Sequence, residues 1–196
     1  MSTSPTPEPA VFVHPQGLNE SGDVGPGTRI WAFAHVMRGA TVGSDCNIGD
    51  HAFVENGARI GSRVTIKNAV LVWDAVTIED DVFLGPAVVF TNDHNPRAHR
   101  RLDPEAFLPT RVSEGATIGA NATILCGLVV GSHAFVGAGA VVTRDVAAHA
   151  LVVGNPAHRV GWVCICGRRL EGLSCPCGRH YVMVDEHAGL RERVDG

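Results

Sequence analysis

The chain has 196 residues, a formal net charge of −4, 45% hydrophobic residues and 18% charged residues. This composition predicts one main soluble domain, and the weakly acidic charge gives no electrostatic reason to expect nucleic acid or an anionic membrane as a partner. No apolar run approaches the roughly 18 residues that a membrane-spanning helix needs. The start, MSTSPTPEPA, lacks the basic and apolar regions of a secretory signal. The sequence therefore predicts a cytoplasmic protein.

Residues 1–10 are rich in proline, serine and threonine and are predicted to form a loose tail. From Val24 a branched aliphatic residue or phenylalanine recurs at every sixth position. The pattern has no slip up to Phe90, and it resumes from Val112 to Val142. Phe12 and Leu18 fall on the same register, which predicts a degenerate starting coil over residues 11–23.

A period of six fits neither the face of a helix nor the face of a strand. It suits a short extended run followed by a bend, so that three such sides close one coil and coils stack at about 4.8 Å. Six coils give a prism about 29 Å long. The sequence therefore predicts an all-β fold, a parallel β-helix of about six coils over residues 11–159.

The residue after each inward aliphatic is expected at a corner, where glycine tolerates backbone angles that other residues cannot adopt. Two columns of corners are rich in glycine, and the third has none: Met37, Glu55, Trp73, Thr91, Leu125 and Thr143. A long insertion, residues 92–111, leaves from this third corner. Long insertions in a strict repeat are usually functional, so we expect the site at this edge.

One flat side of the prism carries mostly apolar outward residues: His35, Phe53, Leu71, Val89, Thr123 and Val141. A continuous apolar column on a surface marks an interface, and a prism with one such side can close into a ring of three. This pattern predicts a homotrimer with sites in the grooves between subunits. The alternative is a set of isolated apolar surface residues.

Several segments carry a family resemblance: Gly27-Thr28-Arg29-Ile30-Trp31, Glu79 to Pro86, Val89-Phe90-Thr91-Asn92-Asp93, and Gly154-Asn155-Pro156-Ala157. Together they resemble hexapeptide-repeat N-acetyltransferases that act on nucleotide-linked amino sugars. The resemblance implies left-handed coils, a trimer with active sites between prisms, and acetyl-CoA as the donor. It is strongest to enzymes that acetylate UDP-2-acetamido-3-amino-2,3-dideoxyglucuronate or dTDP-3-amino-dideoxyhexoses for cell-surface polysaccharides such as lipopolysaccharide.

The insertion carries the candidate catalytic residues Asn92, Asp93 and His94. A sugar amine must be neutral to attack a thioester, so Asp93 is a candidate to attract or deprotonate it and Asn92 to orient it. His94 is a candidate base, with a solvated loop histidine as the alternative. Backbone N–H groups would stabilise the tetrahedral oxyanion.

Further residues are candidates for binding the two substrates. Glu55 and Trp73 lie on the same corner column as the insertion and are expected to contact the sugar or the base, and three more substrate-binding candidates are His35, Lys67 and Arg97. The resemblance places CoA along the last coils and the tail, with these candidates: Gly137 and Ala138 for the pantetheine arm, Arg144 and Arg159 for phosphates, and Pro156. The alternative for both arginines is ordinary solvated charge.

Residues 160–196 leave the six-residue register and contain two pairs of cysteines, Cys164 and Cys166, then Cys175 and Cys177. Each pair is followed by glycine, as in a zinc knuckle, although one residue rather than two separates the thiols. Four thiolates at this spacing suit a structural zinc ion, and a cytosolic location disfavours disulfides.

Three other functions are compatible with the repeat. The first is O-acetylation of another small acceptor. The second is a γ-carbonic-anhydrase-like metal lyase, suggested by the spacing of His94 and His99. The third is a non-catalytic scaffold, which the polar loop beside the glycine-free corner disfavours.

Overall fold

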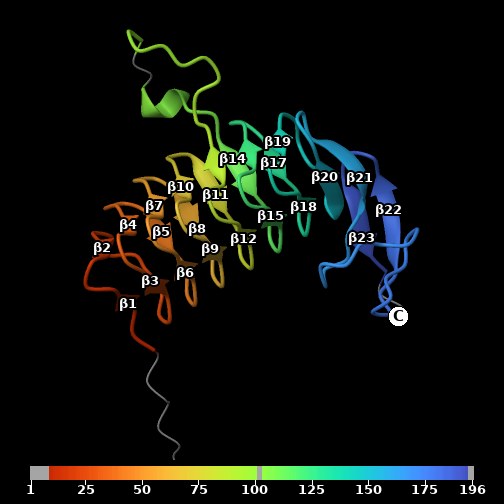
Figure 1. Cartoon of the computed structure of the whole chain (residues 1–196), viewed down its shortest axis with the longest axis horizontal. Coiled ribbons are helices and arrows are strands. Elements are labelled where there is room, and N and C mark those ends of the chain that lie inside the picture. The colour runs from red at the N-terminus through yellow and green to blue at the C-terminus, as the bar shows by residue number, and fades with distance from the viewer. Residues whose placement is uncertain (1–8, 101–102, 194–196) are drawn as a thin grey trace, which may run out of the picture.

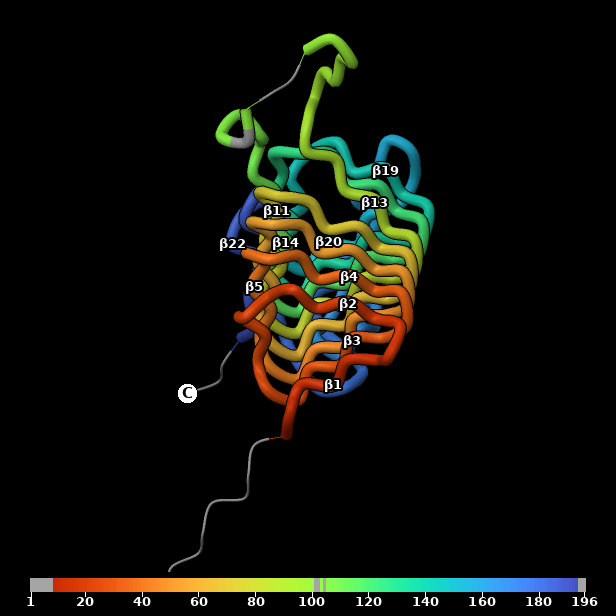
Figure 2. Tube along the Cα trace, turned by 90° about the vertical axis from the view of Figure 1, so that its left-hand side faces the viewer, coloured from red at the N-terminus to blue at the C-terminus, as the bar shows by residue number. Residues whose placement is uncertain are grey.

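The computed structural model describes residues 9–100 and 103–193, so residues 1–8 of the predicted tail lie outside it. The described chain winds into a parallel β-helix with three flat sheets (Figure 1). Figure 2 looks at the N-terminal end of the prism. The first coil runs from the bottom up the right side and then to the left, which is anticlockwise, while the later coils recede from the viewer. A coil that turns anticlockwise as it recedes is left-handed. The fold prediction is confirmed.

Five successive coils, from β3 to β17, each contribute one short strand to each of the three sheets, and the coils at the two ends contribute to fewer sheets. The first sheet contains β1 (Phe12–Val13), β3 (Arg29–Ile30), β6 (Asn47–Ile48), β9 (Thr65–Ile66), β12 (Phe83–Leu84), β15 (Thr117–Ile118), β18 (Phe135–Val136), β20 (Ala150–Val153) and the antiparallel β21 (His158–Trp162). The second contains β2 (Leu18–Asn19), β4 (His35–Val36), β7 (Phe53–Val54), β10 (Leu71–Val72), β13 (Val89–Phe90), β16 (Thr123–Ile124) and β19 (Val141–Val142).

The third sheet contains β5 (Thr41–Val42), β8 (Arg59–Ile60), β11 (Val76–Ile78), β14 (Thr110–Val112) and β17 (Val129–Val130). A 3₁₀ turn, Pro104–Ala106, lies in the insertion, and a hairpin of β22 (Tyr181–Asp185) and β23 (Gly189–Glu192) ends the described chain. None of the helical structure in the described ranges is long and apolar enough to cross a membrane.

The number of turns exceeds the six predicted from the repeat. The first sheet has nine strands, all parallel except β21, which corresponds to about eight turns. The predicted starting coil accounts for one extra turn through β1 and β2. Strand β20 accounts for the other, because it pairs in parallel with β18 beyond the last regular repeat.

The repeat forms this structure because one residue of each unit is buried in the prism and its neighbour faces outward. Ile30, Ile48, Ile66, Leu84 and Ile118 pair in register in the first sheet, and all are fully buried. Partners in this column are normally 18 positions apart, whereas Leu84 and Ile118 are 34 apart. The insertion therefore leaves the coil without shifting the register of the stack.

The predicted reason for the corner glycines is wrong. Positive φ occurs two residues later than expected, for example at Phe33, His51 and Ala69, near 58° in each case. The glycines that directly follow the inward aliphatics are needed because the next coil lies close to them. A Cβ on Gly43 would lie 2.6 Å from the carbonyl carbon and oxygen of Gly61.

This close approach predicts the effect of Gly43→Ala. The added methyl group forces two coils apart, so we expect the free energy of unfolding, measured by chemical denaturation, to fall by about 1–3 kcal/mol. Gly22→Ala is the matched control, because a Cβ at Gly22 meets no atom within 4 Å. Its effect should stay within about 0.5 kcal/mol. Equal stabilities of the two variants would contradict the close-packing explanation.

Candidate functional site

The insertion leaves the prism between β13 and β14 and rises above the coils (Figure 1). It leaves from the glycine-free corner column, which we call the loop edge and define by Met37, Glu55, Trp73, Thr91, Leu125 and Thr143. This edge joins the second and third sheets. The indole N–H of Trp73 donates to the carbonyl oxygen of Phe90 at 2.9 Å, immediately before the loop begins.

Glu55 and Trp73 thus have contacts that hold the root of the loop. The Glu55 carboxylate accepts the backbone N–H of Asp74 at 2.8 Å, and the Trp73 ring packs 5.8 Å from the Phe53 ring, centroid to centroid. Both side chains are only half-buried. They fix the loop root and still present a surface on the edge predicted for the substrate.

The structure brings the three predicted catalytic residues together in a small cavity of the loop. Asn92, Asp93 and His94 line a space of about 190 Å³ with Arg100 and Leu108. One carboxylate oxygen of Asp93 accepts the backbone N–H of Asn95 at 2.7 Å, which fixes the orientation of the carboxylate. Arg97 is exposed and donates to the neighbouring Pro96 carbonyl, and it does not line this cavity.

Cys126 contacts His94 of this cavity, and no local pattern in the sequence marks it as part of the site. Its buried Sγ lies 3.1 Å from Nδ1 of His94, and its backbone N–H donates to Oγ1 of Thr91 at 3.0 Å. Thirty-two positions separate Cys126 from His94. Only the stacking of one coil on the next brings them together.

A larger cavity of about 520 Å³ lies towards the C-terminal end of the prism. Three of the predicted CoA-binding residues, Arg144, Pro156 and Arg159, line it. The loop edge connects the two cavities, since Thr91 hydrogen-bonds to the coil of Leu125 and Leu125 to the coil of Thr143. Two coil spacings place Thr143, the neighbour of Arg144, about 10 Å along the edge from Thr91.

Other candidates lie elsewhere on the prism. Lys67, Gly137 and Ala138 belong to a second edge, between the first and second sheets. Lys67 lines a shallow cavity there with Trp31 and Asp50. His35 faces outward from the second sheet, where its Nε2 lies 2.8 Å from a Glu20 carboxylate oxygen. A single chain therefore does not bring these four residues to the loop cavity.

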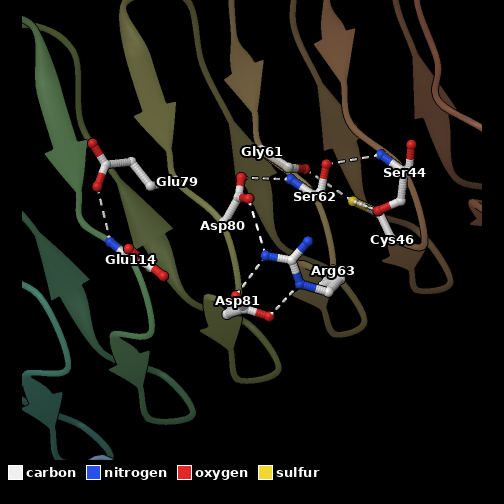
Figure 3. Close-up of polar contacts among 9 residues, drawn as sticks. All are labelled: Ser44, Cys46, Gly61, Ser62, Arg63, Glu79, Asp80, Asp81 and Glu114. Carbon is white, nitrogen blue, oxygen red and sulfur yellow. Dashed lines mark hydrogen bonds and ion pairs between the residues drawn. The ribbon is translucent and has the colours of Figure 1, made fainter.

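The acidic segment Glu79-Asp80-Asp81 lies on the remaining edge, where it links neighbouring coils (Figure 3). Arg63 donates to Asp81 at 2.7 Å and to Asp80 at 3.0 Å, and Glu79 accepts the backbone N–H of Glu114. The hydrogen bond from Arg63 lowers the pKa of Asp81. These charges stabilise the stacking of coils, away from the loop.

The four C-terminal cysteines meet in one cluster. The sulfur atoms of Cys164, Cys166, Cys175 and Cys177 all lie within 4.8 Å of one another. A backbone hydrogen bond from Arg179, helped by a side-chain hydrogen bond from Cys175, lowers the pKa of Cys177 to about 6. Within the described ranges this is the one group of three or more metal-ligating side chains, so His94 and His99 are not part of such a group in a single chain.

Comparison with known proteins agrees with the coil geometry. Residues 23–56 and 109–144 match the family model described as bacterial transferase hexapeptide (six repeats). A curated relative from Aneurinibacillus thermoaerophilus, dTDP-3-amino-3,6-dideoxy-alpha-D-galactopyranose 3-N-acetyltransferase, is 49% identical over 89% of this chain and 92% of its own length.

Two solved structures of the acetyltransferase domain of PglB from Neisseria gonorrhoeae FA1090 share the fold. One matches with a TM-score of 0.54 at 23% identity, and the other, in complex with acetyl coenzyme A, with a TM-score of 0.54 at 21% identity. Each match covers 78% of this chain and 58% of the solved chain. The repeat, the left-handed coils and the extent of the match to the curated relative show that the chain belongs to the hexapeptide-repeat family of bacterial transferases.

Proposed function

We propose that this protein is an acetyl-CoA-dependent N-acetyltransferase that acts on the amino group of a nucleotide-linked 3-amino sugar. The observation that carries the proposal is the cavity of Asn92, Asp93 and His94 on the same edge as the cavity of Arg144, Pro156 and Arg159. Similarity along most of the chain to a dTDP-amino-sugar N-acetyltransferase makes dTDP-3-amino-dideoxyhexoses the first candidates. The product would serve the synthesis of a cell-surface glycan.

The loop residues suit the chemistry of amide formation. The Asp93 carboxylate attracts the sugar ammonium, with one oxygen fixed by the Asn95 N–H and the other available to the amine. Asn92 orients the amine, which gives one proton to the Asp93 carboxylate and, once neutral, attacks the thioester carbonyl carbon; the nitrogen of the resulting tetrahedral intermediate then loses a second proton. The tetrahedral intermediate then collapses, the C–S bond breaks, and the CoA thiolate takes up a proton. Backbone N–H groups in the groove stabilise the oxyanion.

His94 is a second candidate acceptor for the amine proton. Its Nδ1 contacts the Cys126 sulfur at 3.1 Å, so the tautomer with the proton on Nδ1 leaves Nε2 as a free acceptor. We rank His94 below Asn92 and Asp93, because its ring lies on the exposed part of the loop.

The donor is assigned to the larger cavity. Arg144 and Arg159 supply positive charge for the phosphates of CoA, and Pro156 adds an apolar surface. Gly137 and Ala138, on the second edge, leave room for the pantetheine arm close to the backbone. Glu55, Trp73, Arg97, His35 and Lys67 remain candidates for the nucleotide sugar.

The division of these candidates between two edges supports a homotrimer, in which the loop edge of one prism faces the second edge of its neighbour. The second sheet supplies an apolar surface for such contact, since Leu71 and Val89 are 38% and 47% exposed in the isolated chain. Neighbouring copies would then complete each site.

Light scattering tests the assembly. We expect a mass near 62 kDa, three times the chain mass of 20.7 kDa. Leu71→Arg should lower this mass, because it places a charge in the apolar column. Val129→Arg, at an outward position of the third sheet that is 42% exposed, should leave it unchanged. A mass equal to that of one chain would exclude the trimer.

We also propose that Cys164, Cys166, Cys175 and Cys177 hold one structural zinc ion. Their sulfur spacing supports this donor set, because four thiolates bind Zn²⁺ in a closed tetrahedral site. We also propose that the protein is cytoplasmic, where the reducing environment keeps thiols available for a metal ion.

A thiol-release assay against a panel of UDP- and dTDP-linked amino sugars tests the function. We expect CoA release with a 3-amino sugar and none with the matching 3-hydroxy sugar. Release with the 3-hydroxy sugar would indicate O-acetylation instead. Asp93→Asn should lower kcat/KM by about 10²–10⁴-fold, and Asn92→Ala should also lower it. Asp103→Asn, in the same loop but outside the cavity, is the matched control. Full activity of both site variants would remove the assignment.

A further inference from the structure

One lining residue of the larger cavity comes from the cysteine-containing segment. Most of its lining residues belong to the last coil and to residues 155–159, but Glu186 belongs to the turn of the β22–β23 hairpin. A carboxylate at this position suits hydrogen-bond donors of CoA, such as an amide N–H of the pantetheine arm or the adenine amino group. The segment beyond the coils therefore contributes to the candidate donor site.

This hairpin is attached to the end of the prism through close backbone contacts. The N–H of Ala148 donates to the carbonyl oxygen of Ala188, and the N–H of Leu190 donates to that of Ala148, both at 3.2 Å. A Cβ on Gly189 would lie 2.2 Å from the Ala148 oxygen, so this position has no room for a side chain.

Side chains make a second attachment. His149 is buried, and its Nδ1–H donates to the carbonyl oxygen of Val163 at 2.9 Å. Its ring lies 4.8 Å from the ring of Tyr181, whose hydroxyl donates to the sulfur of Cys164 at 3.1 Å. A continuous chain of contacts therefore joins the end of the prism to a metal-binding sulfur.

Contacts also run from the cysteine cluster to the phosphate-binding side of the cavity. Trp162 packs against both the core of the prism and the small core of the cysteine segment. The guanidinium of Arg159 lies 4.4 Å from the centroid of the Trp162 ring, and Arg169 donates to the Val160 carbonyl at 2.6 Å. The position of Arg159 thus depends on residues of the cysteine segment.

The cysteine segment has too small a core to hold this arrangement by packing alone. In the part that the structure describes, its buried cluster consists of Cys164, Leu170, Cys175, Tyr181 and Leu190. Segments of this size usually need a metal or disulfides, and metal binding then supplies the free energy of folding. A bound ion would tie the two cysteine pairs together and hold both Trp162 and the hairpin in place.

We propose that occupancy of the four-cysteine site by a thiophilic divalent cation such as Zn²⁺ controls the affinity for acetyl-CoA by holding Arg159 and Glu186 in place in the lining of the donor cavity. This proposal rests on the proposed function, which assigns CoA to that cavity. It predicts that the metal acts on donor binding and leaves the binding of the nucleotide sugar at the loop unchanged.

The first experiment removes the metal from the full chain. Elemental analysis should find about one zinc per chain, and a chelator should raise the Kd for CoA by at least tenfold in calorimetry, with recovery on adding Zn²⁺ and no recovery on adding Mg²⁺. Affinity for the nucleotide sugar should stay unchanged. Absence of zinc from the pure protein, or equal CoA affinity with and without it, would overturn the proposal.

A second experiment leaves the cysteines intact. Gly189→Ala should retain zinc but raise the Kd for CoA at least tenfold, because the new Cβ separates the hairpin from Ala148. Gly172→Ala is the matched control: Gly172 also has positive φ, 62°, but its Cβ would meet no atom within 4 Å. Equal CoA affinities of the two variants would contradict the coupling.

Hydrogen exchange distinguishes failure of the coupling between zinc and CoA binding from failure of the proposed function. If the zinc-loaded protein binds no CoA, the proposed function fails. The coupling then still predicts faster exchange of residues 155–162 and 186–190 after zinc removal, and unchanged exchange there would reject it as well.

Discussion

The stacking of each coil on the next is the constraint on which the rest of this structure depends. Neighbouring coils are joined by backbone hydrogen bonds, and the coils from Ile30 to Val142 each bury one aliphatic or phenylalanine side chain from each flat side. Glycine is required where successive corners approach too closely for a Cβ, as at Gly43 and Gly119. Non-glycine residues elsewhere in each coil accept positive φ, for example His51 and Ala69. A strain of about 1–2 kcal/mol per such residue is offset by the regular stack.

Because the stack is rigid, the positions of the polar groups follow from the repeat. Residues 18 positions apart become neighbours along an edge, so Thr91, Leu125 and Thr143 form one line in spite of the insertion between them. The loop cavity and the larger cavity share this line. A long and flexible donor such as acetyl-CoA, which we propose as a substrate, would suit an edge of this kind, because one straight surface offers separate positions for its phosphates and its thioester.

The fold could be predicted from the sequence to a large extent, because a strict period of six leaves few other ways to bury a side chain in every unit. The turn beyond Val146 could not, because β20 breaks the period. The role of the corner glycines was also missed, since only the positions of neighbouring backbones distinguish close approach from positive φ. For the site, the sequence brought forward Asn92, Asp93 and His94, but not Cys126 or Glu186. Cys126 contacts His94 of the loop cavity and Glu186 lines the larger cavity, each through contacts between distant segments, and no local motif marks them.

The C-terminal segment has a further consequence for the prism as a whole. A β-helix has two open ends, and each end coil presents unpaired backbone groups on which another coil can stack. The antiparallel strand β21 covers the first sheet at its last coil, and the β22–β23 hairpin occupies the neighbouring backbone at Ala148. The segment that we propose as part of the donor site therefore also gives the stack a definite length. Loss of this cover would expose a growing end, and the protein would gain a route to end-to-end fibres.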